Sequence, residues 1–273
     1  CLPRFDAARA LALIEAEAIA SLYLVPTLYH DLLAHPHFYG TDVSSVRRLG
    51  FAGASMTDGL LKRVADAFRP ERFVNHYGSS EIYTFTIHQD APAKPGSAGR
   101  AGLNQIVRVV PLEAEGADEI CPPGVEGQIV ALLSGDEAFE GYWRRPDADS
   151  KALRNGWYFT GDSGFFDADG DLFVTGRVDD MIITGGENVS PAEIESCLSM
   201  HPAVAECAVV GLPDPRWGQI VAAFVKRSGP ITADELDDHC RASSLARFKR
   251  PRTIRFVAEI PKSPVGKLLR RKL

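Results

Sequence analysis

The chain has 273 residues, a formal net charge of −6, 45% hydrophobic residues and 24% charged residues. These values are typical of a globular protein with one large domain or two modest ones, and they exclude collagen-like and disordered chains. No stretch approaches the roughly 18 apolar residues of a membrane span, and no secretory signal is evident, so we expect a cytoplasmic location. Five scattered cysteines without a CxxC pair predict reduced thiols and no structural zinc site.

Helix and strand patterns alternate over residues 6–76. The predicted helices are 6–19, 26–33 and 56–68, and the predicted strands are 21–25, 46–51 and 72–76. This order predicts an α/β domain with a parallel sheet and crossover helices. The last strand leads into Tyr77-Gly78-Ser79-Ser80-Glu81, and open α/β sheets bind their ligands at such strand ends.

The pattern changes in the second half of the chain. Short apolar runs separated by Gly, Pro and Asp predict a β-rich region at about 92–176. Beyond it we predict strands at 181–183, 207–211, 220–226 and 253–257, and helices at 191–199 and 233–243. The expected fold class is α/β, with a domain over 1–178 that includes the β-rich region and a small α+β domain over 179–273.

Positive charge gathers at the C-terminal end. Residues 241–273 hold eleven basic residues and one acidic residue, a net charge of +10, which leaves −16 for residues 1–240. This contrast suggests a polyanionic partner, and a solvated basic face is the equally weighted alternative. No nucleic-acid-binding motif is evident, so we expect no nucleic-acid partner.

Four glycine-containing segments, 77–81, 156–162, 176–180 and 184–188, carry polar residues suited to a nucleotide, although each alone is typical of a turn. The Ser79-Ser80-Glu81 turn offers hydroxyls and a carboxylate to a phosphate and a magnesium ion. Asp162 suits paired ribose hydroxyls, and Arg177 could reach the same sugar or a phosphate. Lys267 could neutralise charge on a transferring phosphoryl group.

Taken together, these segments resemble the motifs of the AMP-forming acyl-CoA synthetases, in the acyl- and aryl-adenylate-forming superfamily. The motifs are Tyr-Gly-x-Ser/Thr-Glu, Gly-Trp-x-x-Thr-Gly-Asp, Gly-Arg-x-Asp-Asp, Gly-Gly-Glu-Asn and a terminal Gly-Lys. Residues 177–183, 216–219 and 248–251 look most similar to aryl-CoA ligases of the 4-chlorobenzoate type. The resemblance covers essentially the whole chain. It implies that 1–178 is the C-terminal part of a larger domain and that 179–273 is a mobile lid with its hinge at Asp179.

The resemblance implies an acid:CoA ligase that uses ATP, Mg²⁺ and CoA to join an aromatic or related carboxylic acid to CoA through an acyl-AMP. It assigns two catalytic residues, Glu81 as the Mg²⁺ ligand and Lys267 at the adenylation transition state. The implied nucleotide contacts are Gly53 and Ala54 against adenine, Tyr77 stacked on adenine, Gly78, Ser79 and Ser80 in the turn, and Asp162 with Arg177 at the ribose. The implied CoA contacts are Gly185, Gly186, Trp217, Phe248, Arg250 and Arg252. Glu187 and Asn188, beside the glycine pair, are equally well explained as a helix N-terminal signal.

The implied acyl pocket consists of His76, Gly78, Ile82 and Tyr83. A histidine and a tyrosine make this pocket more polar than a site for a halobenzoate. A hydroxylated aromatic acid or another polar carboxylic acid is therefore our hypothesis for the substrate.

The sequence departs from the family chiefly in a missing motif. The glycine-, serine- and threonine-rich phosphate loop does not occur in it. We therefore expect a missing N-terminal half of the same enzyme to carry that loop, and the chain alone to be inactive in adenylation. Two alternatives stay open: a non-catalytic nucleotide- or CoA-binding remnant, and an adenylation domain that loads a carrier protein. Fatty acids as substrates and a homo-oligomer are also left open.

Overall fold

The computed structural model describes residues 2, 4–263 and 268–273, and it separates into two compact units. Unit 1 consists of residues 1–56, 60–160 and 164–174, and unit 2 consists of residues 57–59, 161–163 and 175–273. Lys267 lies outside the described residues. Within the described part of the chain, no helix is long and apolar enough to cross a membrane.

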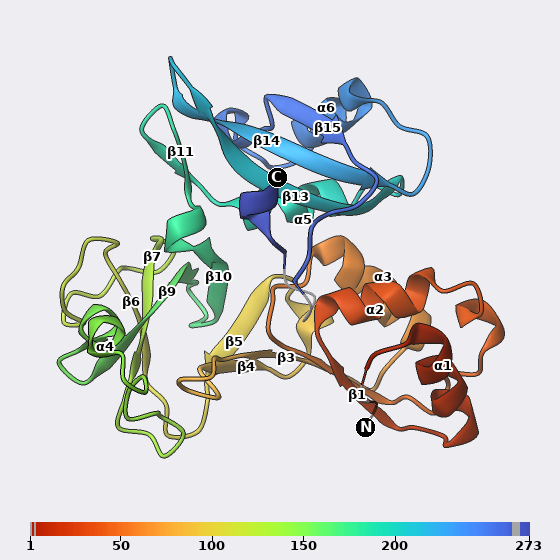
Figure 1. The fold of residues 1–273 in the computed structure, drawn as a ribbon, viewed down its shortest axis with the longest axis horizontal. Helices are drawn as coiled ribbons and strands as arrows, with labels where there is room; N and C mark the ends of the chain where they lie inside the picture. Colours follow the sequence, from red (N-terminus) through yellow and green to blue (C-terminus); the bar gives the residue numbers. More distant parts are fainter. Residues whose placement is uncertain (1, 3, 264–267) are drawn as a thin grey trace. The chain divides into compact units, whose positions relative to one another are not determined.

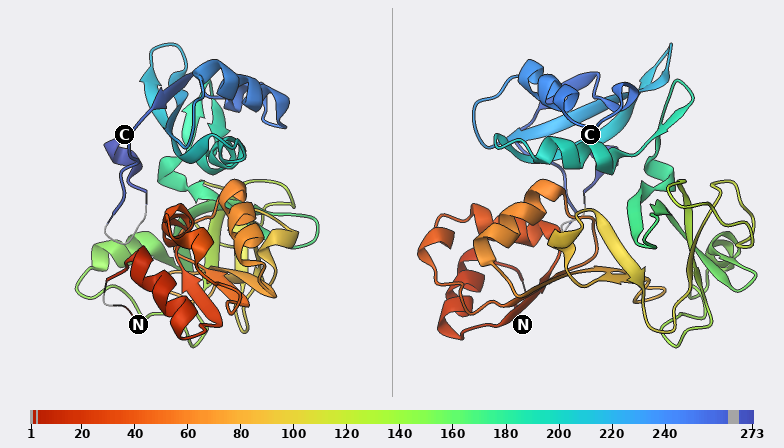
Figure 2. Two further views of the ribbon diagram at one scale, coloured as in Figure 1. Left: turned by 90° about the vertical axis from the view of Figure 1, so that its right-hand side faces the viewer. Right: turned by 180° about the vertical axis from the view of Figure 1, so that it is seen from behind.

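The first part of unit 1 is a parallel sheet with alternating helices (Figure 1). The strands are β1 (Ser21–Leu24), β2 (Arg48–Phe51) and β3 (Arg72–Tyr77), and the helices are α1 (Ala7–Ala16), α2 (Pro26–Ala34) and α3 (Asp58–Phe68). Leu49, Phe51 and Phe73 pack in one apolar cluster with side chains from all three helices. Figure 2 shows the ribbons of these strands and helices in red and orange. The α/β prediction is therefore confirmed. Helix α1 ends earlier than predicted, before Ala18, which has a φ of +46°.

The next part of the chain is rich in strands. They are β4 (Thr86–His88), β5 (Ser97–Ala101), β6 (Val107–Val110), β7 (Gly127–Leu132), β8 (Leu153–Arg154), β9 (Trp157–Phe166) and β10 (Leu172–Arg177), with helix α4 (Pro146–Ala152) before β8. Residues 161–163 of β9 and 175–177 of β10 belong to unit 2. The sheet order is β1-β2-β3-β4-β5-β10-β9-β7-β6, and β8 pairs with β9. Sequence patterns predicted neither β4 nor β5, because Thr86 and Ser97 are buried polar residues that interrupt an apolar pattern.

Unit 2 contains a second sheet with helices on one face. Its strands are β11 (Ile182–Thr184), β12 (Glu187–Val189), β13 (Val204–Asp214), β14 (Gly218–Arg227) and β15 (Thr253–Phe256), and its helices are α5 (Pro191–Ser199) and α6 (Ala233–Ala242). The order is β12-β11-β14-β13, with β15 parallel to β14. Ile194 and Leu236 of the two helices pack with Val209 and Val221 of the sheet. Ala208 and Phe224 belong to a second cluster, with Leu268 and Leu273 near the C-terminus packed against it.

Five short 3₁₀ helices complete the secondary structure of the described residues: η1 (Phe38–Gly40), η2 (Ala91–Ala93), η3 (Val178–Asp180), η4 (Arg247–Lys249) and η5 (Arg270–Lys272). Glu187 and Asn188 lie in strand β12, and α5 begins only after Ser190. Their explanation as a helix N-terminal signal is therefore wrong.

Candidate functional site

The turn after β3 folds back tightly on itself. The Phe85 N–H donates to the Tyr77 carbonyl oxygen at 2.8 Å. A Cβ atom on Gly78 would lie only 1.8 Å from the carbonyl oxygen of Tyr83. The close approach of these two backbone segments therefore requires glycine at position 78.

Ser79 holds the inside of this turn. Its N–H donates to the Ile82 carbonyl oxygen at 2.9 Å, and its hydroxyl oxygen accepts the N–H groups of Glu81 at 3.1 Å and Ile82 at 3.3 Å. Ser80, by contrast, is exposed. The neighbouring serines therefore differ in role, because Ser79 stabilises the turn whereas Ser80 faces solvent, where a ligand can reach it.

Glu81 is held as a carboxylate by a neighbour that the sequence did not reveal. The Tyr142 hydroxyl donates to Glu81 Oε1 at 2.7 Å, across 61 residues of sequence. Burial alone raises the pKa of Glu81, but hydrogen bonds from Tyr142 and Ser79 outweigh it and hold the pKa below its ordinary value. Burial, followed by the bond to Glu81, raises the pKa of Tyr142. Glu81 thus stays ionised at neutral pH, as a ligand for a divalent cation must be.

The segment predicted to contact adenine lies at the same edge of the sheet. Phe51 of β2 pairs in parallel with Asn75 of β3, so the two strands end side by side. Gly53, with a φ of +81°, and Ala54 follow β2 and are both exposed. The fold therefore brings them to the edge where Tyr77 begins its turn.

His76 lies in a polar network. Its Nδ1 is 2.6 Å from the Tyr23 hydroxyl, and its Nε2 is 3.2 Å from the Thr84 hydroxyl. The ring of Tyr83, 65% exposed, meets the His76 ring edge-on with centroids 4.9 Å apart. Tyr23 and Thr84 were not predicted, because only the pairing of strands and the tight turn bring them to His76.

Ile82 differs from its expected role. Its side chain is 0% exposed and packs with Phe85, Ala131 and Tyr158 in an apolar cluster. A side chain enclosed in this way is part of the core of unit 1 and does not line an open pocket. Ile82 is therefore removed from the set of acyl-pocket residues that the sequence suggested.

In unit 2, the structure brings Asp162 and Arg177 together. Arg177 Nη1 donates to Asp162 Oδ1 at 2.7 Å. A Cβ atom on Gly161 would lie 2.7 Å from Arg177 Nη2, so the guanidinium group lies against this glycine. The side chain of Asp162 is 17% exposed and that of Arg177 is 52% exposed. This pair offers a carboxylate and a guanidinium side by side, which is suitable for hydroxyls and a phosphate of the same ligand.

A second group in unit 2 is built around Trp217. Gly185, with a φ of +62°, donates its N–H to the Trp217 carbonyl oxygen at 2.9 Å, and a Cβ atom there would lie 2.9 Å from the indole ring. The guanidinium groups of Arg216 and Arg252 lie 4.9 and 4.6 Å from the indole centroid. Gly186 follows with a φ of +87°. The result is an aromatic platform with two positive charges, suited to an anionic ligand.

Phe248, Arg250 and Asp179 lie in or next to two 3₁₀ helices of unit 2. Phe248 is 43% exposed in η4, and Arg250 Nε donates to the Leu245 carbonyl oxygen at 3.4 Å. Asp179 is exposed in η3, directly after the Arg177-Val178 pair. Their assigned roles remain predictions.

Among the described residues, one group of three acidic side chains is close enough together to bind a metal ion, but it already binds the ammonium group of Lys94. Asp167, Asp169 and Asp171 offer oxygen atoms within 4.8 Å of one another. Lys94 Nζ lies 2.5, 2.9 and 2.6 Å from these three carboxylates. Hydrogen bonds to Asp167, Asp171 and Asp169 raise the pKa of Lys94. This cluster is therefore a structural ion-pair network.

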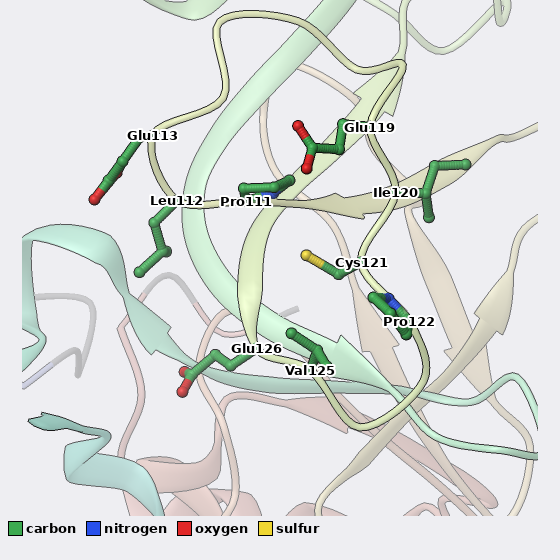
Figure 3. Close-up of a pocket in the computed structure, with 9 residues that line it drawn as sticks. All are labelled: Pro111, Leu112, Glu113, Glu119, Ile120, Cys121, Pro122, Val125 and Glu126. Carbon is green, nitrogen blue, oxygen red and sulfur yellow. The ribbon is translucent and has the colours of Figure 1, made fainter.

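A surface hollow of about 450 Å³ lies in the β-rich part of unit 1 (Figure 3). It is lined by Pro111, Leu112, Glu113, Glu119, Ile120, Cys121, Pro122, Val125 and Glu126. None of these is a residue that the sequence pointed to. Its three glutamates are unfavourable for a phosphate-bearing ligand, so we do not assign the nucleotide to it.

Comparison with known proteins identifies the family. The model of the AMP-binding enzymes matches residues 1–143, and that of the AMP-binding enzyme C-terminal domain matches residues 193–267. The chain belongs to the AMP-binding enzyme family. It is 41% identical to a 4-chlorobenzoate–CoA ligase of Arthrobacter sp. over 98% of the chain and 51% of that protein. It is 37% identical to a feruloyl-CoA synthase of Amycolatopsis sp. over 97% of the chain and 53% of that protein.

Solved structures are similar as well. The anthranilate CoA ligase AuaEII, in complex with anthranoyl-AMP, superposes with a TM-score of 0.88 at 32% identity, over 97% of this chain and 51% of that one. An o-succinylbenzoate CoA synthetase of Bacillus subtilis, bound to its acyl-adenylate, gives a TM-score of 0.81 at 31% identity, over 98% and 54%. The chain thus spans about half the length of the relatives it matches.

Proposed function

We propose that the protein to which this chain belongs is an AMP-forming acid:CoA ligase. The proposal is carried by Glu81, a carboxylate kept ionised by Tyr142 in the glycine turn of a chain that both family models match. The similarity to a 4-chlorobenzoate–CoA ligase over 98% of the chain supports an aromatic or related acid as the substrate. Trp217 with its two arginines supports free CoA as the acceptor, in preference to a carrier protein.

The proposed reaction has two steps. A carboxylate oxygen of the acid attacks the α-phosphorus of ATP, the bond to the β-phosphate breaks, and acyl-AMP and pyrophosphate form. The CoA thiol, after losing its proton to solvent, then attacks the acyl carbon and displaces AMP. In this proposal Tyr77, Gly53 and Ala54 contact adenine, Ser80 contacts the α-phosphate, and Asp162 and Arg177 bind the ribose. Asp179 is the hinge between residues 1–178 and the lid.

Glu81 fits the ligand set of Mg²⁺, which is commonly held by one or two carboxylates together with substrate phosphates. When bound, the ion neutralises phosphate charge. Tyr142 keeps the Glu81 carboxylate deprotonated and fixes its Oε1 atom. Lys267 is proposed to stabilise charge in the adenylation transition state.

The polar network around His76 supports a polar substituent on the acid. We propose that His76 and Tyr83, supported by Tyr23 and Thr84, lie beside the acyl group and favour a hydroxylated aromatic acid. We expect His76→Ile to lower the rate with 4-hydroxybenzoate relative to benzoate, with Tyr23→Phe giving a smaller change in the same direction. Unchanged relative rates in both variants would contradict the assignment.

The activity is tested by incubating the native polypeptide with ATP, magnesium and one carboxylic acid at a time and measuring the pyrophosphate that forms. The acids are benzoates, cinnamates, alicyclic acids and fatty acids. We expect release that depends on the acid and turns over only with CoA. Lys267→Ala and Glu81→Gln should abolish it, whereas Glu115→Gln, at an exposed position away from the turn, should not. Folded protein that releases no pyrophosphate with any acid would leave the nucleotide- or CoA-binding alternative.

A further inference from the structure

A partly buried ion pair fixes the C-terminal residues of unit 2. Arg270 Nη2 donates to Oε1 and Oε2 of Glu195 at 2.9 and 2.8 Å. Glu195 lies in helix α5 and is only 5% exposed. Its Oε1 also accepts the N–H of Val209 in strand β13, at 2.8 Å. Arg270 therefore joins the end of the chain to both a helix and a strand of the unit.

The same arginine reaches the beginning of unit 2. Arg270 Nη1 lies 3.6 Å from Asp180 Oδ2. Asp180 directly follows Asp179, the proposed hinge residue. One guanidinium group thus links Asp180 and Glu195 to the C-terminal residues around Arg270, 75 residues beyond Glu195.

A second set of contacts holds the described residues on either side of 264–267. Lys262 and Leu268 form an antiparallel bridge, and the Leu269 N–H donates to the Pro261 carbonyl oxygen at 2.9 Å. Lys262 also forms an ion pair with Glu206 of β13. Leu268 packs against the cluster that contains Ala208 and Phe224. The described residues that precede and follow 264–267 are therefore attached to the sheet of unit 2.

We propose that Arg270 is a positioning residue for adenylation: it clamps residues 268–273, which directly follow Lys267 in the sequence, to Glu195 and Asp180. The inference rests on the proposed function, because Lys267 is assigned to the adenylation step alone. An arginine suits this task, since Nη2 of its planar group contacts both oxygens of Glu195 while Nη1 faces Asp180. The clamp also ties Asp180, which follows the proposed hinge residue, to the C-terminal residues of unit 2.

The test uses the native polypeptide and measures the two half-reactions, adenylation and thioester formation, separately. For Arg270→Ala we expect the acid-dependent exchange of pyrophosphate into ATP to fall about tenfold to a hundredfold in kcat, because small displacements of a catalytic group have effects of this size. The KM values for acid and ATP should change little, as should thioester formation from supplied acyl-AMP and CoA. Arg270→Lys should lie between wild type and Arg270→Ala. The matched control is Arg271→Ala, at the exposed neighbouring position, which should leave both half-reactions unchanged.

A readout without catalysis keeps the inference separate from the proposed function. Hydrogen exchange of peptides covering 261–273 should be faster in Arg270→Ala than in Arg271→Ala. If Arg270→Ala does not fold, Glu195→Gln, which preserves the shape of the side chain and removes its charge, takes its place in both measurements. Unchanged exchange in these peptides, or equal losses in the two half-reactions, would overturn the positioning role. A wild-type protein without any adenylation would instead contradict the proposed function, and the exchange data would still decide whether Arg270 clamps the segment.

Discussion

Gly78→Ala tests how tightly the turn after β3 is built. The new Cβ would lie 1.8 Å from the Tyr83 carbonyl oxygen, and ordinary contact begins at 3.4 Å, so the two backbones must separate by roughly 1.6 Å. This separation stretches the turn's hydrogen bonds, the Phe85–Tyr77 and Ser79–Ile82 pairs, each worth about 1 kcal/mol. We expect a loss of about 2–3 kcal/mol in the free energy of unfolding of unit 1.

The assay is urea unfolding followed by tryptophan fluorescence in a Trp217→Phe background. Trp157 is 9% exposed in unit 1 and reports its unfolding, whereas Trp143 is 84% exposed and changes little. Gly40→Ala is the matched control, since nothing lies within 4 Å of its Cβ position, and we expect a change below about 0.5 kcal/mol. Equal midpoints and equal slopes for the two variants would refute the argument from the close approach.

Three further predictions concern charge and the aromatic platform. Tyr142→Phe removes a hydrogen bond that favours the Glu81 carboxylate, so the acid limb of the pH–rate profile should move to higher pH; an unmoved limb would contradict this role. Lys94→Met should lower the melting temperature at pH 7. The pKa values of Asp167 and Asp171 are held below their ordinary value of about 3.8, so their contribution is present above that value and is lost below it. The difference in melting temperature between Lys94→Met and wild type should therefore shrink as the pH falls toward 3, and a constant difference would argue against the network. Trp217→Ala should raise the KM for CoA and leave pyrophosphate exchange unchanged, which kinetics of the separate half-reactions would reveal.

Much of the fold followed from local patterns in the sequence. Helix α5 occupies its predicted residues, and β1 to β3 pair in parallel as the alternation of helices and strands indicated. Strand β12 was missed, because Glu187 and Asn188 are exposed and carry no apolar alternation. Its partner β11 supplies the hydrogen bonds that make it a strand. Such pairing is visible only when both strands are placed.

In the candidate site, too, the sequence predicted some features and missed others. The glycines were informative because a close approach of two backbone segments, as at Gly78, and a positive φ, as at Gly185, both require glycine at that position of the chain. Motif spacing likewise selected Glu81, Asp162 and Arg177 directly. Burial was harder to foresee, since Ile82 shares its segment with Tyr83 but points into the core.

The sequence by itself determined the family, the positions of the glycine turns and the residue types available for a nucleotide and CoA. Only the tertiary structure decided which distant side chains form hydrogen bonds with the acidic residues of the chain. Tyr142 reaches Glu81 across 61 residues, and Arg270 reaches Glu195 across 75. The physical reason is that a hydrogen bond requires contact within about 3 Å, and contacts between distant segments depend on how strands and helices pack, which no local pattern encodes.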